Sequence, residues 1–234
     1  MLSDTAAVIV AAGQGRRMGG TNKSLLRLNG LPLLSYSIRA FRNCDSIGKI
    51  VVVMNDYDVK RMQSEWQTDP IQLGADLVVA GGEERWISSR NGVEAACEGH
   101  DFVLVHDAAR PLISSSDIEQ IIINVRQHGC ALAAEPLADT LKRCSGDTRV
   151  ASTLDRQDLW RAQTPQGASC AIMQQAFASW NVKEQGLPTD ESMLLENIEQ
   201  HPHLVACSGP NFKLTTSSDL CLAEALLKCS AVQG

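Results

Sequence analysis

Residues 6–20 read Ala6-Ala-Val-Ile-Val-Ala-Ala-Gly13-Gln-Gly15-Arg-Arg17-Met-Gly-Gly20, and Lys23 follows close behind. An apolar run of strand length therefore leads directly into a loop that is rich in glycine and in cationic side chains. Glycine lets backbone N–H groups crowd around an anion, because it has no side chain to hold them apart. The cations then meet the charge that the N–H groups leave unneutralised. The stretch predicts a polyphosphate site on the first βα turn of an open α/β sheet.

The spacing of these glycines argues against two familiar nucleotide sites. Gly13, Gly15 and Gly19 form G-x-G-x-x-x-G, which misses the dinucleotide fingerprint by one residue. Residues 33–39 also lack the acidic residue that would bind a ribose hydroxyl. No Gly-Lys-Ser/Thr sequence closes the loop around Lys23, as it would in a Walker motif. A nicotinamide dehydrogenase and a P-loop ATPase are therefore both disfavoured.

The composition is that of an ordinary folded protein. The chain has 234 residues, of which 44% are hydrophobic and 21% charged, and its net charge is −6. This acidic balance argues against binding to nucleic acid, which normally needs a basic face. The eight cysteines form no Cys-x-x-Cys pair and no zinc-like spacing, so we expect reduced thiols in a cytoplasmic protein. The first apolar run is short and no basic segment precedes it, which predicts a core strand and neither a signal peptide nor a membrane span.

Strand and helix patterns alternate through the first 136 residues. Apolar runs predict strands at residues 7–12, 50–54, 77–80, 102–106 and 130–135. Helical patterns lie between them, at residues 33–41, 59–67, 85–96 and 116–128. This rhythm predicts an α/β fold with a Rossmann-like, doubly wound and mostly parallel sheet. Ligands on such sheets lie beyond the carboxyl ends of the strands, so we expect loops 13–23, 81–85 and 106–110 at one rim.

The alternation breaks near residue 138. Two short polar segments, 140–143 and 150–153, are joined by turn-forming residues and predict a β-hairpin. Such a hairpin is marginal by itself. We therefore expect an arm at about residues 138–158 of a single domain, packed against a second copy of the chain. Beyond the arm we expect helices at residues 168–180, 191–197 and 219–227, and a strand pair at 204–207 and 212–214.

Polar residues follow two of the predicted strands. Asp107 comes after the fourth strand and faces the phosphate loop, where one carboxylate suffices for a Mg²⁺ ion that is bound to polyphosphate. The alternative is that Asp107 caps the next turn. After the third strand, Gly82 permits close approach of the backbone, and Ser88 on the following helix can donate to a base or a phosphate.

The arm and the late part of the chain add further donors and one cation. Thr140, Arg156 and Thr164 are suited to a phosphorylated, hydroxylated second substrate, although Arg156 taken alone also fits a solvated surface residue. Lys213 lies in a late apolar segment, where an unpaired cation is costly. Its ammonium group must therefore reach water or face an anion.

Six motifs occur in an order that matches one family: Ala-Ala-Gly-x-Gly-Arg-Arg-Met, Gly-Gly-x-Glu-Arg-x-x-Ser, His-Asp-Ala-Ala-Arg-Pro, Asp-Thr-x-Lys, Asp-Arg-x-x-Leu-Trp-x-Ala-x-Thr-Pro-Gln and Thr-Asp-Glu. With them, the sequence resembles the 2-C-methyl-D-erythritol 4-phosphate cytidylyltransferases of the non-mevalonate isoprenoid pathway. The resemblance implies a Mg²⁺-dependent nucleotidyltransferase that joins CTP and methylerythritol phosphate, giving 4-diphosphocytidyl-2-C-methyl-D-erythritol and pyrophosphate. Two alternatives stay open: a pentitol acceptor such as ribitol 5-phosphate, and a catalytically impaired member that binds nucleotide.

The resemblance also implies roles for single residues. The catalytic cations that it implies are Arg17, Lys23 and Lys213. The nucleotide pocket would comprise Ala11, Ala12, Gly13, Gly15, Gly82, Glu83 and Ser88. The metal and substrate aspartate would be Asp107, and the acceptor side would include Arg110, Thr140, Arg156 and Thr164.

In the family the arm crosses into a partner subunit. The resemblance thus implies a homodimer, in which Thr140 and Arg156 serve the neighbouring site. Two departures from the family pattern stand out. Members usually carry Pro-Lys-Gln where this chain has Asn22-Lys23-Ser24, and an Asp where it has Pro210.

Overall fold

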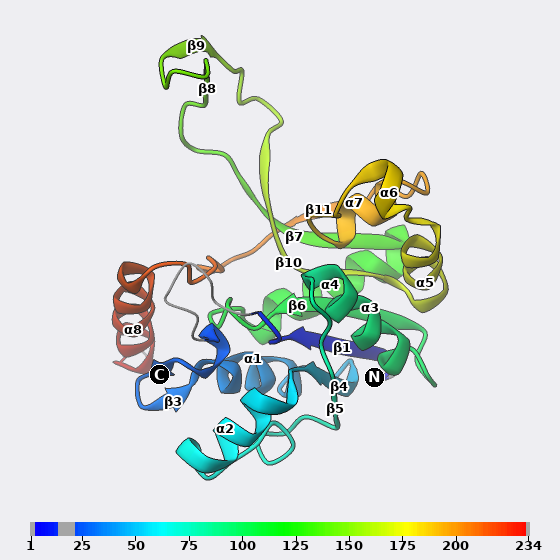
Figure 1. Ribbon diagram of the computed structural model, residues 1–234, viewed down its shortest axis with the longest axis vertical. Helices are drawn as coiled ribbons and strands as arrows, with labels where there is room; N and C mark the ends of the chain where they lie inside the picture. The colour runs from blue at the N-terminus through cyan, green and yellow to red at the C-terminus, as the bar shows by residue number, and fades with distance from the viewer. Residues whose placement is uncertain (1–2, 14–21, 233–234) are drawn as a thin grey trace.

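The computed structural model describes residues 3–13 and 22–232, with a seven-stranded sheet at its centre (Figure 1). The strands of this sheet are β1 (Thr5–Val10), β4 (Ile47–Val53), β5 (Leu77–Val79), β6 (Phe102–Asp107), β7 (Cys130–Pro136), β10 (Trp160–Ser169) and β11 (His203–Ala206). Their order across the sheet is β11-β7-β10-β6-β1-β4-β5. All neighbouring pairs are parallel except the two that β10 makes, with β6 and β7. The predicted fold class is confirmed.

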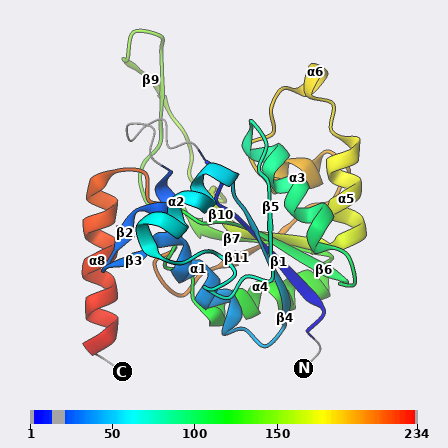
Figure 2. The ribbon, with the colours of Figure 1, turned by 60° about the horizontal axis from the view of Figure 1, so that its bottom comes forward.

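Helices cover both faces of the sheet (Figure 2). The helices of the described residues are α1 (Leu33–Arg42), α2 (Asp56–Trp66), α3 (Arg85–Ala96), α4 (Ser115–His128), α5 (Cys170–Ser179), α6 (Val182–Gln185), α7 (Glu191–Glu196) and α8 (Ser217–Val232). Buried side chains of α1, α2 and α4 form one core with the sheet, and those of α3, α5 and α7 form a second core on the opposite face. A short η2 helix (Lys23–Leu25) and the strands β2 (Arg27–Leu28) and β3 (Leu31–Pro32) follow the first loop.

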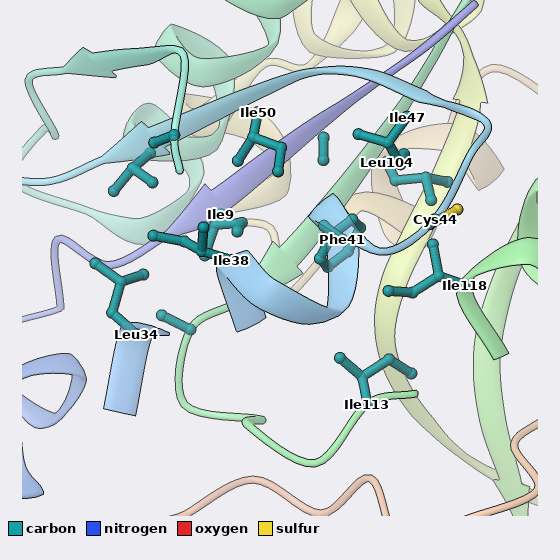
Figure 3. Close-up of a cluster of buried hydrophobic side chains, with 14 of the residues drawn as sticks. Ile9, Leu34, Ile38, Phe41, Cys44, Ile47, Ile50, Leu104, Ile113 and Ile118 are labelled. Atoms are coloured by element: carbon teal, nitrogen blue, oxygen red, sulfur yellow. The ribbon is translucent and has the colours of Figure 1, made fainter. Parts of the chain in front are cut away.

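The first core shows why the aliphatic runs become strands (Figure 3). Ile9 of β1, Leu104 of β6 and Phe41 of α1 are all fully buried in it. Burial of such a side chain stabilises the fold by roughly 1.5–3 kcal/mol. Parallel strands that are covered on both faces need apolar side chains on both, which produces the near-continuous runs seen in the sequence.

Strand β10 has no counterpart among the predicted strands. The sequence pattern predicts no strand between residues 154 and 166 and a helix from residue 168, whereas β10 lies inside the sheet between β7 and β6 and α5 begins at Cys170. Pro165 in the middle of the segment argues against a central strand, because proline cannot donate to the ladder. A register shift between Ala162 and Gln166 accommodates it. The strand is made without an aliphatic run, so no hydrophobic pattern indicated it.

The predicted pairing of residues 204–207 with residues 212–214 is wrong. Strand β11 pairs in parallel with β7 instead, and residues 212–214 form no strand. The Leu214 N–H group donates to the Ala109 carbonyl at 2.8 Å, and Phe212 packs beside Leu28 and Leu33. These contacts hold the segment across the carboxyl edge of the sheet, next to the loop that follows β6.

The predicted hairpin is present and projects far from the sheet (Figure 1). Strands β8 (Lys142–Cys144) and β9 (Val150–Thr153) pair in antiparallel fashion, and every residue of both strands is exposed. We call residues 138–158, which include both strands, the arm. Thr216 and Asp219 cap the last helix: Thr216 N–H donates to Asp219 Oδ2 at 2.7 Å, and Asp219 N–H donates to Thr216 Oγ1 at 3.3 Å.

The described part of the chain contains no helix long and apolar enough to cross a membrane. All eight cysteines lie in described segments, and all are free thiols. Five of them, Cys44, Cys97, Cys130, Cys170 and Cys207, lie within or against the two cores. They pack there as small apolar side chains.

Candidate functional site

A cavity of about 520 Å³ opens at the carboxyl ends of β1 and β6. Its lining comprises Val10, Ala11, Ala12, Gly13, Asn22, Lys23, Ser24, Gly82, Glu83, Glu84, Arg85, Ser88, Asp107, Ala108, Ala109, Lys213 and Thr215. The described part of the first loop, Gly13, Asn22 and Lys23, therefore meets residues 82–85 and 107–109 at one rim, as predicted from the sequence. A smaller cavity of about 160 Å³ adjoins it and shares Arg85, Asp107 and Lys213 with it.

Two glycines allow close packing of the loop before α3, Gly81 against Ala12 after β1 and Gly82 against Ile87 of α3 itself. A Cβ at Gly81 would lie 2.3 Å from Ala12 Cβ, and one at Gly82 would lie 2.2 Å from Ile87 Cγ2. Ser88 then fixes this turn, since its hydroxyl accepts from the Gly82 N–H at 3.0 Å and donates to the Glu84 carbonyl at 3.3 Å. Ser88 therefore lines the larger cavity, but its hydroxyl donates its hydrogen bond to a carbonyl of its own chain.

The loop lysine reaches across the larger cavity to the segment after β11. Lys23 Nζ donates to the carbonyls of Leu214 and Thr215, at 3.3 and 3.2 Å. This segment also carries Lys213, so the two cations border the same cavity. Two ammonium groups on one cavity favour an anionic ligand.

Asp107 is the centre of a buried ionic network. Lys213 Nζ donates to Asp107 Oδ2 at 2.6 Å, and Arg85 Nε donates to Asp107 Oδ1 at 2.9 Å. Arg85 also forms a bidentate pair with Glu191, through Nη1 at 2.8 Å and Nη2 at 3.0 Å. The side chain of Glu191 is only 1% exposed and that of Asp107 only 10%. Two cations thus balance two buried carboxylates at the junction of the cavities.

These cations keep Asp107 ionised. Burial by itself would raise the pKa of Asp107, but Arg85 and Lys213 outweigh it and hold the pKa well below its usual range. Its neighbour His106 stays neutral, because full burial lowers the pKa of His106 to about 4. His106 Nε2 donates to the Arg110 carbonyl at 3.1 Å, and the Thr164 hydroxyl donates to Nδ1 at 3.1 Å. The partners fix this tautomer, since a carbonyl can only accept.

The smaller cavity brings the substrate aspartate together with two of the residues assigned to the acceptor side. Asp107, Arg110 and Thr164 line it. Thr164 Oγ1 accepts from the Asp107 N–H at 3.0 Å, which ties β10 to the end of β6. Arg110 Nη1 donates to the Asn211 carbonyl at 2.7 Å.

The remaining predicted site residues divide into two groups. Thr140 and Arg156 are exposed on the arm and line neither cavity of their own chain. Arg156 donates to the Ala138 carbonyl, at the base of the arm. Gly15 and Arg17 lie outside the described residues.

Sequence reasoning missed Arg85 and Glu191 as parts of the site. Both occur in the motifs quoted above, but nothing in the spacing suggested that they meet. One signal was available: Arg85 is the first residue of α3. A cation is unfavourable at a helix N-terminus, so an arginine there requires a carboxylate partner from elsewhere in the chain.

Comparisons with known proteins agree with this geometry. The profile of the 2-C-methyl-D-erythritol 4-phosphate cytidylyltransferase family matches residues 5–229. The enzyme of that name from Alkaliphilus oremlandii is 34% identical over 228 residues, which are 97% of this chain and 96% of that protein. The one from Halalkalibacterium halodurans is 37% identical over 221 residues, 94% of this chain and 95% of that protein.

Solved structures of the same family are also similar to this chain. The crystal structure of 2-C-methyl-D-erythritol 4-phosphate cytidylyltransferase from Thermus thermophilus is similar to this chain with a TM-score of 0.76 at 29% identity. The alignment covers 95% of this chain and 98% of that one. The match extends over the sheet, the cavity and the arm together, and the chain therefore belongs to the 2-C-methyl-D-erythritol 4-phosphate cytidylyltransferase family.

Proposed function

We propose that the two adjoining cavities hold the two substrates of the family's reaction, with Asp107, Lys213 and Arg85 between them. In this reaction CTP and 2-C-methyl-D-erythritol 4-phosphate give 4-diphosphocytidyl-2-C-methyl-D-erythritol and pyrophosphate. The observation that carries the proposal is the sharing of these three side chains by both cavities. The reacting phosphorus must lie where the two substrates meet, and this is where the charged groups are concentrated.

The larger cavity would hold CTP. Backbone groups around Ala11, Ala12 and Gly13 and on the α3 turn, at Gly82, Glu83 and Ser88, would enclose the cytidine. Lys23, together with Arg17 and Gly15 of the first loop, would bind the triphosphate. Such a pocket excludes purines by size. Its cations neutralise the charge that builds up on the leaving pyrophosphate.

The smaller cavity would hold the acceptor, with Arg110 and Thr164 near its phosphate and hydroxyl groups. An oxygen of the acceptor phosphate attacks the α-phosphorus of CTP and forms a new P–O bond. The P–O bond to the β-phosphate breaks, and pyrophosphate leaves with the electron pair. The attacking phosphate is already an anion, so no general base is needed and catalysis consists of positioning and charge stabilisation.

Asp107 is suited to hold Mg²⁺. No group of three His, Cys, Asp or Glu ligands forms a closed metal cage among the described residues. Magnesium needs none, because it takes one or two carboxylates and completes its shell with phosphate oxygens and water. Asp107 Oδ2 accepts one hydrogen bond, from Lys213 Nζ, which leaves it a lone pair for a cation, whereas Oδ1 lies 2.9 Å from both Nε and Nη2 of Arg85. Bound there, Mg²⁺ would supply charge stabilisation to the phosphates.

Completion of the site requires a second chain. The arm, which carries Thr140 and Arg156, projects away from the sheet (Figure 1), and we propose that these two residues reach the acceptor phosphate of a partner in a homodimer. Exchange of identical arms gives a closed two-fold assembly. We also propose a cytoplasmic location, which the eight free thiols support.

The test of the function is pyrophosphate release from CTP, measured with each acceptor. We expect methylerythritol phosphate to be used with a kcat/KM at least about 10²-fold above that for ribitol 5-phosphate, since a site that loses matched polar contacts discriminates strongly. The full-length relatives favour this acceptor, as their names specify it. Equal use of ribitol 5-phosphate would overturn the acceptor assignment, and no release with either would indicate an impaired member.

A further inference from the structure

We propose that Asp58 of α2 is a positioning residue for Lys23, acting through the side chain of Asn22. The inference rests on the proposed role of Lys23 in binding the triphosphate. Asp58 lines neither cavity, so it does not touch a substrate. It is nevertheless only 4% exposed, and a buried carboxylate needs donors.

Asn22 is the link, and all of its hydrogen-bonding capacity is used. Its Nδ2 donates to Asp58 Oδ2 at 2.6 Å and to the Ala11 carbonyl at 2.7 Å. Its Oδ1 accepts from the N–H of Ser24 at 3.1 Å and from the Ser24 hydroxyl at 2.5 Å. Carboxylate and carbonyl oxygens can only accept, which fixes the amide in this orientation. Asn22 therefore connects the end of β1, the start of α2 and the residue that follows Lys23.

Helix α2 is well placed to act as the fixed support. Asn55 caps it, since its Oδ1 accepts from the Asp58 N–H at 2.8 Å while its Nδ2 donates to Asp58 Oδ2 at 2.7 Å. At the other end of α2, the Arg27 guanidinium lies 4.5 Å from the centre of the Trp66 ring. The two ends of α2 thus contact Asn22 and Arg27, which flank Lys23 and its neighbours. Figure 2 shows the helix beside β2 and β3.

The consequence for Lys23 follows from its place between two tethered neighbours. Asn22 is 5% exposed and Ser24 is 3% exposed, and both side chains bond to the Ala11 carbonyl or to each other. The backbone of Lys23 cannot shift without breaking these bonds. Where the family usually has Pro-Lys-Gln, this chain holds its lysine with a buried polar network that is anchored on Asp58.

The experiment measures the kcat and the KM for CTP in the Asp58→Ala variant. We expect kcat to fall about 10-fold or more with a smaller change in KM, since a small misplacement of a catalytic group is costly. Asp58→Asn retains a side-chain oxygen that can accept from Asn22 and should recover most of the loss. The matched control is Asp56→Ala, which removes the same charge from the same turn of α2 at an exposed position and should leave kcat unchanged.

A double variant separates positioning from a general structural effect. In Lys23→Ala, adding Asp58→Ala should cause no further loss of kcat, because the residue that Asp58 positions is gone. Multiplication of the two losses would overturn the proposal, and so would an Asp58→Asn variant that is as slow as Asp58→Ala while fully folded by urea unfolding. Near wild-type turnover of Lys23→Ala alone would instead refute the proposed role of Lys23. The two failures are thereby distinguishable.

Discussion

The rim around Asp107 and the arm carry parts of the same proposed site, yet they are built in opposite ways. At the rim, charged side chains from distant parts of the sequence are buried and bonded to one another, as Arg85, Asp107 and Glu191 are. On the arm, β8 and β9 pair only with each other, and all their residues are exposed. The rim is thus formed by folding of one chain, whereas the role that we propose for the arm residues needs a second copy of the chain.

This contrast predicts which property a substitution changes in each region. A change at the rim alters both the stability and the chemistry of the chain that carries it. A change on the arm should leave the stability of its own chain intact and act on another copy. The following predictions test this division.

The largest effect is expected from Arg85→Met, which leaves Asp107 and Glu191 without their shared cation. Removal of one partner of a buried ion pair costs about 3 kcal/mol or more. The free energy of unfolding, measured with urea, should fall by this amount. The comparison variant is Arg149→Ala on the arm, whose arginine pairs with Asp147 but is 86% exposed. A loss at Arg149 as large as that at Arg85 would remove the distinction between the two regions.

The variant Lys23→Ala should change the catalytic rate of the rim and leave the stability of the fold nearly unchanged. We expect kcat for pyrophosphate release to fall about 10²-fold or more, by analogy with the loss of one preorganised donor at a developing charge. Urea unfolding should change little, because the ammonium group donates to the carbonyls of Leu214 and Thr215 at the cavity, where water can replace it. Turnover near the wild-type rate would show that Lys23 is an ordinary loop lysine.

Asp107→Asn should weaken the metal dependence of the reaction. The neutral amide is a poorer Mg²⁺ ligand than a carboxylate, and the midpoint of a Mg²⁺ titration of the rate should move up by about 10-fold, as typical for altered coordination. Direct Mn²⁺ binding, measured by electron paramagnetic resonance in the presence of CTP, gives a second readout that does not require turnover. An unchanged midpoint and unchanged binding would leave Asp107 with a structural role only.

The smallest effect is a recovery of activity from two inactive proteins. If Arg156 serves the partner's site, a heterodimer of Arg156→Ala and Lys23→Ala chains has one site with both defects and one with neither. Random pairing makes half of the dimers heterodimers. The mixture should then recover roughly a quarter of wild-type activity. Recovery near zero, with subunit exchange confirmed by mass spectrometry, would contradict the shared site.

The sequence predicted those parts of the fold that hydrophobic patterns encode. Strands β1, β4 and β6 are aliphatic runs, because a parallel strand that is buried on both faces needs apolar side chains at nearly every position. Strand β10 was missed because Pro165 and its polar neighbours carry no such pattern, and the segment at residues 212–214 was misread because its apolar residues pack against Leu28 and Leu33 rather than in a sheet.

The site was likewise predictable where local sequence encodes it and not where distant residues meet. Gly82, Lys23 and Asp107 stand in short motifs, and the neighbouring residues in the sequence are enough to predict their chemistry. The partnership of Arg85 with Glu191 joins residues from separate helices, α3 and α7, and depends on the packing of both against the sheet. The tethering of Asn22 by Asp58 is equally non-local. Only the folded chain brings such pairs together.

The position of β10 between β7 and β6 also determines when the sheet can be completed during synthesis. Strand β7 leaves the ribosome before β10, but its neighbours in the sheet are β10 and β11 alone. Until residues 160–169 emerge, the open edge of β6 exposes unpaired backbone groups, which is a hazard for aggregation. At about 5–20 residues per second, the nascent chain spends roughly one to five seconds making the arm while this gap stays open. Strand β7 can therefore join the sheet begun by β1, β4, β5 and β6 only after the arm has been made.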